Sequence, residues 1–117
     1  MVNTIDGYGL TPIHRLISID NIITVHYFEY SKNYIFEGER HNFWEFLYVD
    51  KGHINVKARD TMYMLSKGQV IFHEPNEWHT VLANGESAPN LVVIAFECQS
   101  ESMDYFKQRI LSIDGHL

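Results

Sequence analysis

The chain consists largely of short stretches in which β-branched and aromatic residues alternate with polar ones, a pattern typical of half-buried strands. These stretches occupy residues 23–31, 41–50, 53–58, 61–68, 69–83 and 91–98. Turn signals such as Asp50-Lys51-Gly52 separate them. Pro75 divides the 69–83 stretch in two, because proline cannot donate to a central ladder. Roughly eight short, evenly spaced strands predict an all-β sandwich or small barrel.

The periodicity changes only near the C-terminus. Met103, Phe106, Ile110 and Leu111 recur at helical spacing, which predicts one amphipathic helix within residues 100–115. The apolar stripe would pack either on the chain's own sheet or on a second copy, and in the latter case these four residues are the dimerisation contacts. A helix of this kind is an unusual place for a protein to finish, which suggests that the sequence is part of a longer one.

Composition and charge narrow the function classes. The 117 residues fit one domain, and an apolar share of 45% is enough for a core. A net charge of −6 argues against nucleic-acid binding by this piece, since phosphate contacts need a basic face. A single cysteine, Cys98, excludes an internal disulfide, and neither a signal peptide nor a long apolar run is evident. We therefore expect a cytoplasmic domain.

Candidate chemistry begins in the stretch GERHNFWEFLYVDKG, residues 38–52. In an uninterrupted strand, alternate side chains share a face, so Glu39, His41 and Glu45 would stand on one wall with Leu47. An imidazole and carboxylates on one wall can bind a divalent metal or hydrogen-bond a polar ligand. A His–Glu pair that only stabilises the strand fits the same spacing, so this stretch alone leaves both interpretations open.

A second stretch, GQVIFHEPNEWHTV at residues 68–81, places His79 after a proline-containing turn. Together the two stretches resemble the cupin superfamily, which is recognised by two short motifs. The first cupin motif is matched by His41, Glu45 and Gly52, with Glu39 in place of the first histidine. The resemblance implies a cupin-like double-stranded β-helix, a jelly-roll barrel, over residues 21–99.

The second cupin motif is matched by Gly68 and His79 at the right separation. Its usual Pro-x-Gly turn reads Glu74-Pro75-Asn76 in this chain. Asparagine tolerates the left-handed backbone conformation better than most residues, so Asn76 can replace the glycine.

The cupin resemblance also implies a candidate metal site. In metal cupins the positions of His41, Glu45 and His79 are ligands, and Glu39 could supply an oxygen in place of the missing histidine. Such a set suits Zn, Ni, Mn or Fe. With a bound ion, the chain would be a stand-alone metal-dependent cupin enzyme, for example a dioxygenase or an isomerase.

A narrower resemblance covers RHNFWEFLYVDKG, YMLSKGQVIFHEPNEWHTV and APNLVVIAFECQSESMDYF. These segments are similar to the N-terminal sensor domain of AraC-type transcription regulators. The resemblance implies a homodimeric, non-catalytic domain that binds a small effector, a sugar or another metabolite, in the barrel. In that family DNA is bound by a C-terminal pair of helix-turn-helix units, which this sequence lacks.

On this interpretation Glu39, His41, Glu45 and His79 are the polar anchors of the effector, and inward apolar residues such as Leu47, Val81 and Val93 shape the pocket. Trp44 and Trp78 flank the two motifs and either pack or stack on the ligand. Residues 1–20 are expected to form an arm over the barrel mouth, and residues 100–117 to begin the linker and dimerisation region. A dimerisation domain with a vestigial pocket is a further alternative. The remaining histidines lack a partner at ligand spacing and are expected at the surface or in the core: His14, His26, His53, His73 and His116.

Overall fold

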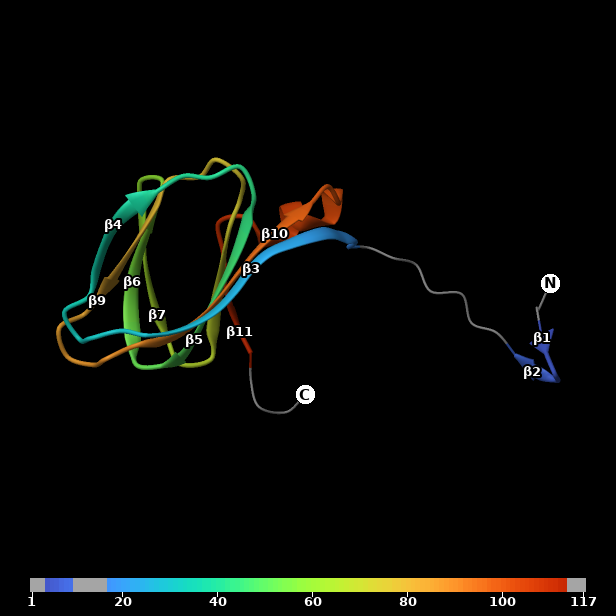
Figure 1. Cartoon of the computed structure of the whole chain (residues 1–117), viewed down its shortest axis with the longest axis horizontal. Helices are drawn as coiled ribbons and strands as arrows, with labels where there is room; N and C mark the ends of the chain where they lie inside the picture. Colours follow the sequence, from blue (N-terminus) through green and yellow to red (C-terminus); the bar gives the residue numbers. More distant parts are fainter. Residues whose placement is uncertain (1–3, 10–16, 114–117) are drawn as a thin grey trace.

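The computed structural model of the chain describes residues 4–9 and 17–113. A small hairpin, β1 (Thr4–Ile5) and β2 (Tyr8–Gly9), is followed by strands that form two facing antiparallel sheets. Figure 1 shows the hairpin apart from the barrel. The arm was expected over residues 1–20. Of these the structure describes residues 4–9 and 17–20, and the remainder of the arm lies outside the described residues.

The five-stranded sheet has the order β11-β8-β5-β10-β3, and the four-stranded sheet has the order β4-β9-β6-β7. The strands are β3 (Ile19–Glu29), β4 (Ile35–Glu39), β5 (Trp44–Lys51), β6 (His53–Ala58), β7 (Thr61–Ser66), β8 (Gln69–His73), β9 (His79–Ala83), β10 (Asn90–Cys98) and β11 (Ile110–Ser112). The sequence correctly predicted the break between β8 and β9. The expected hairpin of residues 41–50 with 53–58 is wrong, because β5 and β6 follow each other across the turn at Gly52 but belong to different sheets, where β5 pairs with β8 and β10 and β6 pairs with β7 and β9. The sequence also did not predict β4 as a strand.

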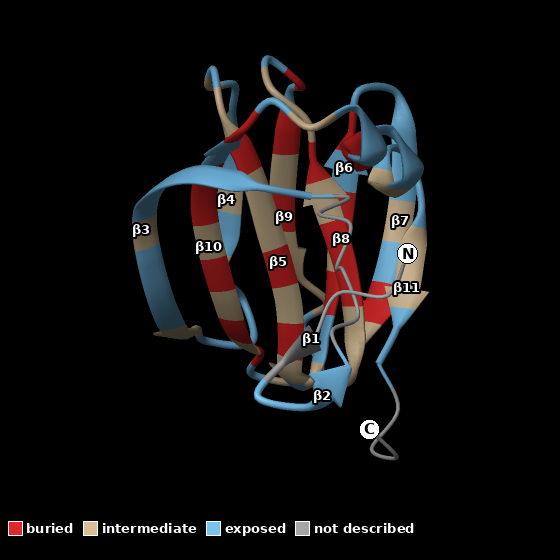
Figure 2. Ribbon diagram, turned by 90° about the vertical axis from the view of Figure 1, so that its right-hand side faces the viewer, coloured by how far each residue is buried: buried red, intermediate tan, exposed pale blue. Residues whose placement is uncertain are grey.

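The main core lies between the two sheets. It contains buried Leu47, Val49, Ile54, Val56, Leu65, Ile71, Val81, Leu91 and Val93. Figure 2 shows buried residues alternating with less buried ones along β5 and β10. This alternation follows from the two-residue period of a strand whose inner face is packed.

A second apolar cluster lies on the other face of the five-stranded sheet. Trp44, Phe96 and Cys98 pack there with Met103, and Phe46, Phe72 and Phe106 surround them. Met103 and Phe106 come from a short 3-10 helix, η1 (Glu101–Phe106). The helical stripe of the sequence therefore packs on its own sheet, which is one of the two arrangements left open.

The prediction of a single helix through residues 100–115 is wrong beyond Phe106. Lys107 is extended, Gln108 has a positive φ of 53°, and Ile110–Ser112 forms β11. Ile110 and Leu111 pair with Ile71 and Val70, so β11 satisfies the backbone edge of β8. An edge strand that still needs partners outweighs a helical pattern of only four residues.

Candidate functional site

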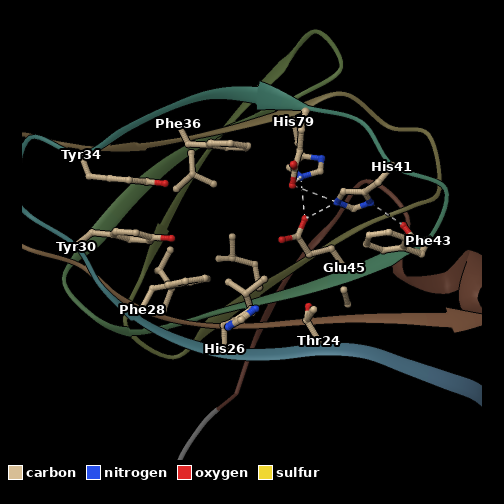
Figure 3. Close-up of a pocket in the computed structure, with 16 residues that line it drawn as sticks. Thr24, His26, Phe28, Tyr30, Tyr34, Phe36, His41, Phe43, Glu45 and His79 are labelled. Atoms are coloured by element: carbon tan, nitrogen blue, oxygen red, sulfur yellow. Dashed lines mark hydrogen bonds and ion pairs between the residues drawn. The ribbon is translucent and has the colours of Figure 1, made fainter.

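Four titratable side chains meet near one end of the barrel interior (Figure 3). Glu39 ends β4, His41 follows it, Glu45 belongs to β5, and His79 begins β9. One ligand atom from each lies within 4.8 Å of the other three. The structure thus brings together all four residues that the sequence proposed as polar anchors.

The strand expected to start at residue 41 starts instead at Trp44. The chain passes between β4 and β5 from the four-stranded to the five-stranded sheet, so residues 40–43 pair in neither. The backbone oxygen of His41 accepts a hydrogen bond of 2.7 Å from the backbone N–H of Asn76, which fixes this crossing. Despite the interruption, Glu39, His41 and Glu45 all line the same cavity, as the alternation predicted.

Both histidines have one nitrogen fixed by the backbone. Nδ1 of His41 lies 3.2 Å from the carbonyl oxygen of Phe43, and Nδ1 of His79 lies 3.0 Å from that of Glu77. A carbonyl can only accept, so Nδ1 carries the proton and Nε2 is directed to the cluster. The turn before His79 uses Asn76 with φ of 66°, the left-handed conformation expected of it.

Glu45 is the centre of the cluster. Its Oε2 lies 2.8 Å from Nε2 of His79 and 3.3 Å from Nε2 of His41, and Oε1 of Glu39 lies 3.5 Å from Nε2 of His41. Nε2 of His79 is buried, and its contact with the Glu45 carboxylate is an ion pair when the imidazole is protonated.

The charges of the cluster shift two pKa values in opposite directions. Burial alone would raise the pKa of Glu45, but the contact with His79 and the charges of His73 and His41 outweigh it and lower that pKa. Burial alone would lower the pKa of His79, but the Glu45 carboxylate, with smaller contributions from the Glu77 carbonyl and Glu39, outweighs it and raises that pKa. Each group therefore favours the charged form of the other.

His73, which the sequence placed at the surface or in the core, is fully buried directly behind the cluster. Its ring stacks on that of His79 with centroids 4.0 Å apart, and its Nδ1 lies 3.1 Å from the carboxylate of buried Glu77. Arg59 pairs with the same carboxylate at 3.5 Å. Burial, the largest influence, lowers the pKa of His73. No spacing rule could identify this residue, since it contacts the site through a stacked ring.

The cluster forms one end of a cavity of about 420 Å³ between the two sheets. Leu47, Val81 and Val93 line it, as expected, together with Leu91 and Ala95. Phe43, which shares the parity of His41, also lines the cavity. The sequence did not predict the rest of the aromatic lining, which consists of His26, Phe28, Tyr30, Tyr34 and Phe36. The alternating aromatic residues of the stretch 23–31 were the available signal for part of it.

The two tryptophans proposed as ligand contacts do not line this cavity. Trp44 is buried in the second apolar cluster. Trp78 is half exposed, and its indole lies directly over Gly38, where an added Cβ would approach Cζ2 to 2.5 Å. Trp44, at the start of β5, points to the outer face of its sheet, and Trp78, in the turn before β9, packs on the backbone of Gly38.

The residues of the site fit a divalent metal ion. Two imidazole Nε2 atoms with fixed tautomers and two carboxylates converge on one point, and the hydrogen bonds from Nδ1 are those that metal-bound histidines make.

Among the described residues, no helix is long and apolar enough to span a membrane.

Three solved structures illustrate what the fold is similar to. The cupin domain of Schizosaccharomyces pombe Cnp3 has a TM-score of 0.60 at 10% identity, covering 74% of this chain and 69% of that one. A cupin 2 conserved barrel domain protein from Rhodopseudomonas palustris has 0.55 at 22%, covering 62% and 50%. A mutant of Bacillus subtilis oxalate decarboxylase OxdC has 0.58 at 15%, covering 62% of this chain and only 20% of the decarboxylase.

At these identities the likeness shows the fold alone, and it confirms the predicted cupin-like jelly roll. The search of curated proteins gave no match. A family model described as the AraC-like ligand binding domain matches residues 21–116, which is most of the chain. This match agrees with the sensor resemblance of the sequence and with a cavity whose polar groups converge at one end. The chain belongs to the family of AraC-like ligand binding domains.

Proposed function

We propose that this domain senses a small molecule in the cavity between its sheets, as part of an AraC-type transcription regulator whose DNA-binding half lies outside these 117 residues. The observation that carries the proposal is the amphipathic cavity of about 420 Å³, with Glu39, His41, Glu45 and His79 at one end and a mostly apolar and aromatic lining elsewhere. A few convergent polar groups in a mostly apolar pocket are typical of small-molecule sites.

The place of the cavity suggests how binding is transmitted. Its lining comes from both sheets, including their edge strands β3 and β4. A ligand that contacts both edges favours one spacing of the sheets over others, and this difference in affinity is what shifts a regulator between states. Dimerisation remains a prediction of the family resemblance.

Thermal unfolding of the purified domain with a broad panel of sugars, amines, phenols and organic acids tests the proposal. We expect at least one class to raise the midpoint, since a ligand that binds only the folded state stabilises it. Glu45→Gln should abolish the shift, whereas Glu86→Gln, on an exposed loop away from the cavity, should preserve it. A panel without any shift, or a shift equal in both variants, would contradict sensing at this site.

A second candidate, a metal-dependent cupin, is favoured by the two Nε2 atoms that face the carboxylates. His41, His79, Glu45 and Glu39 would hold the ion. A bound divalent ion would polarise an oxygen of the ligand as a Lewis acid. His79 would have to lose its Nε2 proton to bind, so affinity should fall as the pH falls.

Metal analysis of protein purified without a histidine tag separates the two candidates. The enzyme candidate requires about one equivalent of Zn, Ni, Mn or Fe, and loss of that metal in His79→Ala. Trace metal that is unchanged by this substitution would exclude a resident ion. Ligand-induced stabilisation that persists in EDTA would then leave effector sensing as the function of the cavity.

A further inference from the structure

Four rings of the cavity wall form a continuous stack, which we call the aromatic ladder: His26, Phe28, Tyr30 and Tyr34. Successive centroids are 5.0, 5.2 and 3.7 Å apart, and the interplanar angles are 26°, 20° and 11°. His26 and Phe28 are alternate residues of β3, and Tyr30 continues the same face beyond its end. The strand period therefore aligns the rings in one row.

Stacking decides which part of each ring meets a ligand. The faces of the inner rings lie against neighbouring rings, so the ladder presents ring edges to the cavity, and the hydroxyl groups of Tyr30 and Tyr34 point into it as well (Figure 3). The edge of an aromatic ring is electropositive and its face is electronegative. The favourable partner of such a wall is the face of another aromatic ring. A sugar can hydrogen-bond to the two tyrosine hydroxyls, but its C–H groups pack on ring faces, and the faces of the inner rings are already covered.

The opposite end of the cavity limits the charge of the ligand. Its lining includes the carboxylates of Glu39 and Glu45 but, among the described residues, no lysine or arginine. A ligand carboxylate would lie beside two acidic groups without a fixed cation other than protonated histidine. An amino or hydroxyl group can instead donate to the carboxylates.

We propose that the ligand is an aromatic compound with an amino or hydroxyl head group: its ring lies face-on against the edges of the aromatic ladder, and its head donates to Glu45 and Glu39. This assignment rests on the proposed sensing function of the cavity and specifies its ligand class. It differs from a sugar, the effector class suggested first by the sequence.

Calorimetric titration of the EDTA-treated domain with four probes tests the assignment: tyramine, cyclohexylethylamine, 3-phenylpropionate and xylose. Tyramine should bind roughly 3- to 10-fold more tightly than cyclohexylethylamine, because an edge-to-face aromatic contact adds to area burial. 3-Phenylpropionate and xylose should bind more weakly than either amine.

Substitutions in β3 locate the contact. Phe28→Leu should remove the preference of the domain for tyramine over cyclohexylethylamine, whereas Tyr27→Leu, on the outer face of the same strand, should retain it. If Phe28→Leu does not fold, His26→Leu at the exposed end of the ladder replaces it, with the same expectation.

Each other outcome overturns a stated part of the proposal. Equal binding of cyclohexylethylamine, or tighter binding of xylose, would overturn the aromatic assignment but leave ligand sensing intact. Tighter binding of 3-phenylpropionate, which has an aromatic ring but no amino or hydroxyl group, would overturn the donor head group. Absence of binding by tyramine together with a stabilising ligand in the broad panel would overturn the ligand class alone, and absence of both would overturn the sensing function as well.

Discussion

Replacement of His73 by asparagine should make the domain less sensitive to acid. His73 is buried, its Nδ1 donates to Glu77, and its Nε2 has no partner among the described residues. Burial lowers its folded-state pKa from the ordinary value of 6.5. Below that ordinary value the unfolded chain binds a proton at this position that the folded chain does not, so His73 costs stability as the pH falls.

The magnitude follows from linkage. If His73 stays neutral in the folded state, its protonation in the unfolded chain lowers the free energy of unfolding by about 1.4 kcal/mol between pH 7.5 and 5.5. His79 acts in the opposite direction, because its raised pKa stabilises the fold below the unfolded pKa, and this stability is lost as the pH rises through the folded pKa. The prediction therefore concerns the difference between the wild type and the variant.

Urea unfolding in EDTA at both pH values measures this difference. His73→Asn keeps a donor for Glu77 and removes the titration, so its destabilisation relative to the wild type should shrink by up to about 1.4 kcal/mol at the lower pH. His73→Phe retains a ring of similar shape and also removes the titration. Its destabilisation relative to the wild type should therefore shrink by a similar amount at the lower pH, although its absolute stability differs. Parallel pH dependences of the wild type and both variants would refute the role assigned to His73.

Three further substitutions test the packing. Met103→Asp should destabilise the domain by roughly 2–5 kcal/mol in chemical unfolding without changing its sedimentation, because Met103 is buried in its own chain; a change from dimer to monomer without loss of stability would contradict this. Gly38→Ala should displace the indole of Trp78 and shift its fluorescence to longer wavelength, and an unchanged spectrum would show that the contact is absent. Arg59→Met should lower the free energy of unfolding by about 1–2 kcal/mol, because it removes a charge partner of buried Glu77. An unchanged free energy of unfolding would contradict this prediction.

The polar end of the site could be predicted because strand alternation is a local property. Glu39, His41 and Glu45 occupy alternate positions of one parity. Their side chains line the same cavity even though the chain changes sheets between β4 and β5. His79 was identified by the resemblance of residues 68–81 to the second cupin motif, in which Asn76 replaces the usual glycine. The likeness of both stretches to known motifs then supplied the pairing between distant segments, which alternation alone cannot give.

The aromatic end was only partly signalled by the sequence, because both faces of β3 carry apolar side chains. Val25 and Tyr27 are exposed, whereas His26 and Phe28 line the cavity. Ordinary hydrophobicity would place valine inside before histidine, so the pattern favours the wrong face. The choice depends on how β3 pairs with β10, a contact between residues about 65 positions apart along the chain.

The two ends of the cavity differ in how firmly they are held, and this difference bears on selectivity. His79 is fixed by the Glu77 carbonyl at Nδ1, by the stacked ring of His73 on its face and by Glu45 at Nε2. The aromatic ladder instead lies on an edge strand with one neighbour, so its position depends on fewer contacts. A preorganised polar end can hold the head group of many ligands at little cost, because its groups need no reordering on binding. Discrimination between ligands and the change in sheet spacing on binding should therefore both arise at the aromatic ladder. Substitutions in the ladder can alter specificity without disturbing the cluster of Glu39, His41, Glu45 and His79.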